Sequence, residues 1–94
     1  MSERTAPSLA KLDTLLPMLK ALPASEDQAR LVDDSEWLQR AVAAFHMEAI
    51  RFRMHRVDRA LRLMGDDAAC RAAFEEVRQA LETAGFHTRS HSAP

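Results

Sequence analysis

The sequence has few of the residues that mark a β-sheet, a disulfide-stabilised fold or a membrane span. Its 94 residues include no tyrosine, two glycines, four prolines, one cysteine and one tryptophan. One cysteine cannot form an internal disulfide, and there is no long apolar run or signal peptide, so we expect a soluble, cytoplasmic protein. The formal net charge of −1 argues against a general nucleic-acid or membrane-surface binder.

The residues that are abundant favour α-helix. Leucine, alanine, arginine and glutamate dominate, and these are strong helix formers. The length allows one domain with a small core. We therefore predict an all-α fold, a small helical bundle over residues 8–86, with a flexible N-terminus at 1–7 and a flexible tail at 87–94.

Capping residues and helix breakers divide the chain into three main helices and a short one. The first is predicted at about 8–21, capped by Ser8 and kinked or broken at Pro17. Ser25 and Gln28 have the spacing of a capping box and open a short helix at 25–32. The last helix is predicted at 67–84, with Gly85 as its stop and Phe86 folding back onto it.

A long central helix is the main prediction. From Glu36 to Met64 the chain has no glycine or proline, so one helix is expected at about 35–64, ending at Gly65. It would be about 45 Å long. It would carry two displaced apolar stripes, one covered by helix 8–21 and the other by helix 67–84. The first stripe comprises Leu38, Ala41, Val42, Phe45, Ala49 and Phe52, and the second comprises Ile50, Met54, Val57, Leu61 and Met64.

The length and charge of this helix predict a partner. A compact domain of this size is roughly 30 Å across, too small to bury such a helix alone. Residues 25–36 hold five acids and one arginine, whereas residues 51–62 hold five arginines and one aspartate. Because these charges would match in an antiparallel pair, we expect a homodimer, or else a complex with another helical protein.

Six residues are candidates for the partner-binding surface. Arg51, His55, Arg59 and Arg62 recur every three or four residues, so they share one side of the predicted helix. This side is either a solvated face with weak ion pairs or a surface for an anion or acidic partner. Trp37 and Phe52 are possible anchors.

A second interpretation starts from Cys70. It lies in the first turn of the last helix, where the helix dipole would lower a thiol pKa, although a packed small residue is also expected there. The stretch "RFRMHRVDRALRLMGDDAAC", followed by "VRQAL", resembles the small helical metal- and formaldehyde-responsive repressors. The resemblance covers about a third of the chain. This sequence lacks the second Cys or His of that family's second helix and carries about 50 extra residues in front.

No catalytic or metal-binding pattern is present. We find no phosphate loop, no nucleophile–base pair at a readable spacing, and no close set of metal ligands among the histidines. We therefore expect no enzyme, cofactor or metal site. The predicted function is that of a small interaction or accessory protein acting through helix–helix contacts. The alternative is a nucleic-acid-binding regulator that uses the arginine-rich helix and senses metal or thiol chemistry through Cys70 or the histidines.

Overall fold

A computed structural model describes residues 3–86 and 88, and these residues form four α-helices and no β-strand. The helices are α1 (Ala6–Lys20), α2 (Glu26–Ala43), α3 (Met47–Leu63) and α4 (Ala68–Thr83). The predicted all-α helical bundle is therefore confirmed. The predicted tail at 87–94 lies outside the described residues except for Thr88, as do residues 1 and 2 of the predicted flexible start.

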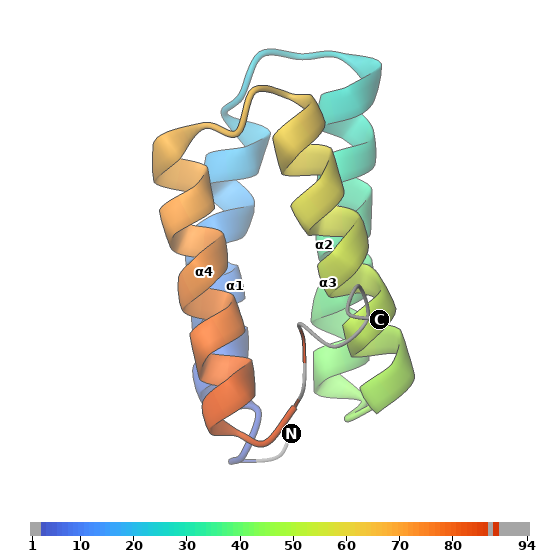
Figure 1. The fold of residues 1–94 in the computed structure, drawn as a ribbon, viewed down its shortest axis with the longest axis vertical. Coiled ribbons are helices and arrows are strands. Elements are labelled where there is room, and N and C mark those ends of the chain that lie inside the picture. The colour runs from blue at the N-terminus through green and yellow to red at the C-terminus, as the bar shows by residue number, and fades with distance from the viewer. Residues whose placement is uncertain (1–2, 87, 89–94) are drawn as a thin grey trace.

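The bundle is built from two pairs of antiparallel helices. Figure 1 shows α1 beside α4 and α2 beside α3, with the start of α1 and the end of α4 at the lower end of the bundle. The two pairs join mainly through α1 and α2, and the contact between α3 and α4 is the smaller one. The molecule measures 33 × 31 × 19 Å, so each helix runs nearly the full height of the bundle.

The predicted long helix at 35–64 is wrong, because the chain turns back after Ala43. Phe45 has a φ of 60°, a left-handed conformation that an aromatic residue seldom adopts. His46 N–H donates to Ala41 O at 3.0 Å and Phe45 N–H donates to Val42 O at 3.1 Å, which together form a Schellman motif. A phenylalanine thus occupies the position that usually holds glycine. The length argument for a second copy of the chain no longer holds.

The next helix begins at the same turn. His46 is the N-cap of α3, and its Nδ1 accepts a hydrogen bond from the N–H of Ala49 at 3.2 Å. The imidazole therefore satisfies a backbone donor that would otherwise lack a partner at the helix start. Two unusual cap residues in sequence, Phe45 and His46, end one helix and start another without glycine or proline.

The predicted short helix at 25–32 is also wrong, because it is the first half of α2. Its cap is confirmed, since Ser25 Oγ accepts a hydrogen bond from Gln28 N–H at 2.9 Å. The predicted restart at Asp34 or Ser35 does not occur. Ser35 Oγ bonds back to Leu31 O at 2.8 Å within the helix, and Asp34 is buried against α3. Because Ser35 bonds within α2 and Asp34 pairs with α3, neither side chain caps a new helix.

The acidic and basic stretches that predicted an antiparallel dimer meet within one chain. Because α2 and α3 are antiparallel neighbours, Asp34 Oδ1 lies 2.8 Å from Arg53 Nη1 and Asp34 Oδ2 lies 3.4 Å from Arg56 Nε. Part of the charge complementarity that predicted a dimer is therefore used inside the α2–α3 hairpin, through Asp34.

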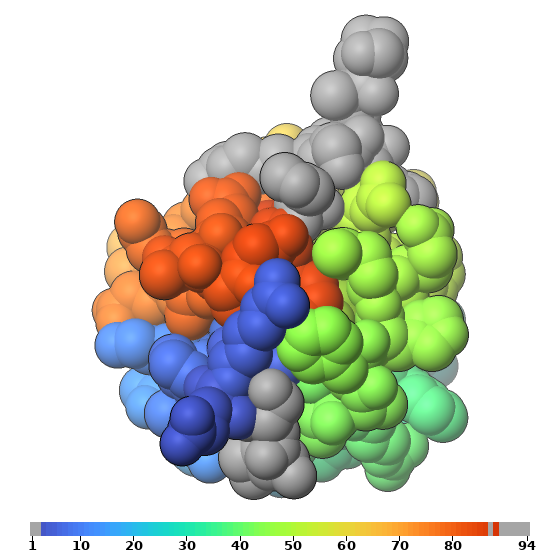
Figure 2. All heavy atoms as spheres, turned by 90° about the horizontal axis from the view of Figure 1, so that it is seen from below, coloured from blue at the N-terminus to red at the C-terminus, as the bar shows by residue number. Residues whose placement is uncertain are grey.

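The first helix differs from its prediction in two respects. It begins at Ala6 with Pro7 in its first turn, and Ser8 is buried within it and caps nothing. It also runs through Pro17 as one helix, since Pro17 lies near its C-terminal end. Before it, Arg4 Nε donates to Ala84 O at 2.7 Å. Figure 2 shows the N-terminal segment crossing between the end of α4 and the α2–α3 turn.

The other helix ends agree with the sequence. Gly65 and Gly85 have φ values of 93° and 98°, and each occupies the left-handed position of a Schellman motif. Asp67 caps α4 by accepting from Cys70 N–H at 3.0 Å. Phe86 folds back as predicted, is 2% exposed, and stacks edge-to-face on Phe45 with ring centroids 5.2 Å apart.

The core contains most of the apolar stripes predicted for the long helix. The first three residues of the first stripe are buried on α2, and four residues of the second are buried on α3. Phe45 and Phe52 from the first stripe are exposed instead, because the turn at Phe45 changes the direction of every residue after it. The largest fully buried side chains are Phe74, Leu12, Leu15, Leu19, Leu31, Leu38, Ile50, Met54, Leu61, Leu81, Val42 and Val57.

Candidate functional site

Two large aromatic side chains lie exposed on the surface shared by α2 and α3. Trp37 of α2 is 43% exposed and Phe52 of α3 is 44% exposed. The guanidinium of Arg53 lies between them, with its carbon 5.3 Å from the Trp37 ring centre and 5.1 Å from the Phe52 ring centre. The hairpin thus brings together two aromatic residues that are 15 positions apart in the sequence.

Two further arginines extend this arrangement at both ends. Arg40 lies over the Trp37 ring at 4.7 Å, and Arg56 lies over the Phe52 ring at 6.0 Å. The order across the surface is therefore Arg40, Trp37, Arg53, Phe52 and Arg56, with guanidinium groups and rings in alternation. We name these five residues the arginine–aromatic face. Each cation–π contact contributes about 0.5–1 kcal/mol at an exposed site.

Asp34 holds the arginines of this face in place. Its side chain is 6% exposed, and its two carboxylate oxygens face Arg53 and Arg56 separately. A buried carboxylate needs such partners, because burying an unpaired charge is costly. Asp34 therefore fixes the guanidinium of Arg53 at the position where it lies between the two rings. Arg53 is therefore held by an ion pair and two ring contacts at once.

The six predicted site residues divide into two groups. Trp37 and Phe52 belong to the arginine–aromatic face, and Arg59 lies beside it on the same outer side of α3. Arg51, His55 and Arg62 lie on another side of α3. Arg51 bonds to Glu48 at 2.8 Å, Arg62 Nε lies 3.3 Å from Asp58 Oδ2, and His55 is half-buried.

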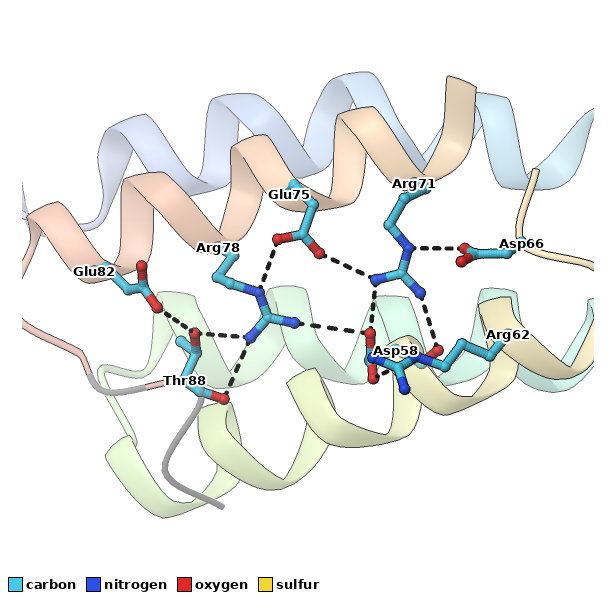
Figure 3. A network of polar contacts seen from close by, with 8 residues as sticks. All are labelled: Asp58, Arg62, Asp66, Arg71, Glu75, Arg78, Glu82 and Thr88. Carbon is cyan, nitrogen blue, oxygen red and sulfur yellow. Dashed lines mark hydrogen bonds and ion pairs between the residues drawn. The ribbon is translucent and has the colours of Figure 1, made fainter. Parts of the chain in front are cut away.

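The side of α3 that faces α4 carries a network of charges instead (Figure 3). Arg71 of α4 bonds to Asp58 of α3 at 2.6 Å, to Asp66 at 2.7 Å and to Glu75 at 3.0 Å. Burial alone would lower the pKa of Arg71, but these three hydrogen bonds outweigh it and raise the pKa. The guanidinium stays charged and ties α3 to α4.

Arg78 completes this network and joins the end of the described chain to it. Its side chain is 8% exposed, and it donates to Glu75 Oε1 at 3.1 Å and to Thr88 Oγ1 at 3.1 Å. Its Nη2 also lies 3.8 Å from Asp58 Oδ1. Because these charges pair with one another across the bundle, we regard the network as structural and not as a binding site.

Cys70 is packed in the hydrophobic core of the bundle. It is 2% exposed, and burial followed by the hydrogen bond to Asp67 raises its pKa to about 11. The predicted lowering of this pKa by the helix dipole is therefore wrong, because desolvation and the nearby carboxylate outweigh it. At neutral pH the side chain is a thiol, the form that neither attacks electrophiles nor binds metal.

The described residues hold no arrangement of three or more His, Cys, Asp or Glu side chains that could hold a metal ion. Within the same part of the chain, each helix is too short or too polar to cross a membrane.

Sequence reasoning missed Asp34, Arg40, Arg53 and Arg56 as site residues. The sequence did place Arg53 and Arg56 near the continuation of the first apolar stripe, which was the available signal. Their pairing with Asp34 could not be predicted, because it depends on the turn at Phe45. No family model, curated protein or solved structure matches this chain.

Proposed function

We propose that this chain is a small non-enzymatic interaction protein that binds another protein through the arginine–aromatic face. The observation that carries the proposal is the exposure of two aromatic rings interleaved with three guanidinium groups. Tryptophan and arginine are the residues most enriched among those that dominate binding energy at protein interfaces. Lone exposed apolar residues are ordinary on a protein surface, whereas an ordered group of this kind is not.

The rigidity of the face supports the same function. A flexible arginine loses conformational entropy when it binds, which reduces the net affinity. Here Asp34 and the two rings already hold the guanidinium of Arg53, so part of that entropy is lost on folding and not on binding. The face therefore has the preorganisation expected of a binding surface.

A single-stranded nucleic acid is the second candidate, because aromatic and arginine side chains also stack on bases. In this chain, however, guanidinium groups already lie over both rings. A base that stacked on either ring would compete with these guanidinium groups. We therefore favour a protein partner, in a complex of which this chain is one subunit. A second copy of the chain is the other partner expected from the sequence, and light scattering of the pure protein distinguishes these cases; we expect a monomer.

The experiment compares the wild type with a Trp37→Ala, Phe52→Ala double variant. Each purified protein is used to capture partners from the source cells, with and without nuclease, and the captured protein is then purified and titrated directly. We expect a defined protein that binds the wild type at fixed stoichiometry and binds the double variant at least tenfold more weakly, since hot-spot truncations cost about 2 kcal/mol or more. Arg62→Ala, which removes an exposed arginine elsewhere on α3, is the control and should bind normally.

Equal binding of that protein to the double variant would show that the face is not the interface. Loss of capture after nuclease treatment would favour the nucleic-acid function instead.

A further inference from the structure

Beside the arginine–aromatic face, the surface of α2 and α3 is hollowed over a volume of about 240 Å³. Arg30 and Asp27 of α2 line one side, and Arg59 and Leu63 of α3 line the other. Arg56 belongs both to the hollow and to the face. The two features therefore form one continuous surface.

Positive charge is in excess in and around the hollow. Five arginines and two aspartates line the hollow and the face together, which gives a balance of 5 − 2 = +3. Asp33, one turn before Trp37, lowers this to +2, in a chain whose net charge is −1. The surface is thus a cationic area on an otherwise slightly acidic protein, and it complements a partner of negative charge.

The arginines of the hollow differ in how far they are already paired. Arg56 shares the buried carboxylate of Asp34 with Arg53, and Arg30 makes only a long, exposed contact of 3.8 Å with Asp27. Arg59 makes no hydrogen bond or ion pair with any described residue. Arg59 and the outer nitrogens of Arg56 can therefore bind an incoming anion without breaking an existing ion pair.

Leu63 adds an apolar component at the same place. Its side chain is 71% exposed, the highest value among the large apolar residues exposed on the described chain. An anion alone would gain nothing from this side chain. A partner that carries both a carboxylate and an apolar side chain would contact Leu63 and the arginines together.

The occupant is better described as another protein than as a second copy of this chain. Several exposed acidic residues of this chain already have partners in it, such as Glu76 with Lys11 at 2.7 Å and Glu48 with Arg51 at 2.8 Å. A monoanionic carboxylate also suits the hollow better than a phosphate does, because Asp27 and Asp34 would repel the second negative charge.

We propose that the hollow receives a carboxylate side chain of an acidic amphipathic helix, held between the guanidinium groups of Arg56 and Arg59. An apolar side chain one turn away on that helix rests on Leu63, and the helix lies along the shallow surface between α2 and α3. This inference rests on the proposed function and names the class of partner that it requires.

The test uses a fluorescently labelled helical peptide with glutamate on one stripe and leucine on the adjacent stripe. Its binding is followed by anisotropy against the wild type, Arg59→Glu, Leu63→Ala and the control Arg62→Ala. Two matched peptides carry glutamine or lysine in place of every glutamate. A single-stranded oligonucleotide and inorganic phosphate serve as competitors. Arg59 and Leu63 are exposed, so both variants should fold, which far-UV circular dichroism checks.

We expect the glutamate peptide to bind the wild type and Arg62→Ala alike, and to bind Arg59→Glu roughly tenfold or more weakly. Leu63→Ala should weaken binding about fivefold, as expected for one partly buried leucine at an interface. The lysine peptide should bind Arg59→Glu better than it binds the wild type.

Three results would overturn this inference. Unchanged binding to Arg59→Glu would place the peptide elsewhere, and equal binding of the glutamine peptide would remove the role of the carboxylate. Displacement of the labelled peptide by the oligonucleotide or by phosphate would show that the hollow binds a different class of ligand. Each of these leaves the proposed function to its own test, since the Trp37→Ala, Phe52→Ala variant and its natural partner report on the face independently of the hollow.

Discussion

Replacing Phe45 by glycine and, separately, by alanine measures the backbone strain at the turn between α2 and α3. Phe45 has a φ of 60°, and a left-handed conformation costs an L-residue about 1–2 kcal/mol relative to glycine. Both replacements remove the ring that stacks on Phe86 and on the guanidinium of Arg4. The loss of packing is therefore common to both variants and cancels when they are compared.

The glycine variant should consequently be more stable than the alanine variant by about 1 kcal/mol, after the greater chain entropy of unfolded glycine is subtracted. Thermal unfolding followed by far-UV circular dichroism should give a melting temperature about 4–8 °C higher for Phe45→Gly than for Phe45→Ala. Ala29→Gly, at an exposed position in α2, is the control and should lower stability by about 1 kcal/mol.

The opposite order at position 45 would refute this reasoning. If residues 36–64 formed one helix, alanine would be preferred over glycine by about 1 kcal/mol, as at position 29. A more stable Phe45→Ala would therefore mean that the hairpin does not form. The length argument for a second copy of the chain would then return.

Three further changes test the account of the core and of the polar residues. Asp34→Asn should lower the free energy of unfolding in urea by about 2 kcal/mol, because Arg53 and Arg56 lose a buried carboxylate; an unchanged value would mean that Asp34 does not hold them. Ser8→Ala should raise the melting temperature by several degrees, since Ser8 Oγ is buried without a hydrogen-bond partner among the described residues, and a lower value would contradict this. The raised pKa of Cys70 means that the folded state binds this proton more tightly than the unfolded state does, so its contribution to stability is complete below about pH 9 and is lost as the pH rises towards about 11. Urea unfolding at both ends of this range should show that the free energy of unfolding falls less for Cys70→Ala than for the wild type. An equal fall in both proteins would mean that the thiol does not titrate as described.

Much of the fold follows from local signals in the sequence. Ser25, Asp67, Gly65 and Gly85 act as caps and stops as their types predict, because capping depends on a few neighbouring residues. The buried stripes of α2 and α3 also follow from helical periodicity. Capping residues and helical periodicity are sufficient to predict the all-α class.

The turn at Phe45 could not be predicted from residue preferences, since phenylalanine disfavours the left-handed conformation that it adopts. Its ring is held by Phe86 from the far end of the chain and by Arg4 from the start, and these tertiary contacts contribute to the turn. One signal was present: the apolar stripe changes direction near His46, where the helix breaks. A change of stripe within an apparently continuous helix can therefore indicate a hairpin.

The candidate site depends on that turn, so only parts of it could be predicted. Trp37 and Phe52 were expected from the sequence as possible anchors, and both side chains are exposed, although Phe52 was also placed in the first apolar stripe. Their proximity, and the positions of Arg53 and Arg56 around Asp34, require α3 to fold back on α2. The prediction that Arg51, His55 and Arg62 share a surface with Arg59 used helical spacing alone. Helical spacing does not show on which side of α3 the helix α4 packs.

The emission of Trp37 in the purified complex with the natural partner tests the central claim most directly, because Trp37 is the single tryptophan of the chain and belongs to the arginine–aromatic face. With a partner that contains no tryptophan, or one whose tryptophans have been replaced, we predict a shift of the emission to shorter wavelength as the ring loses contact with water. An unchanged emission spectrum in a complex of confirmed stoichiometry would contradict the claim that this face binds the partner.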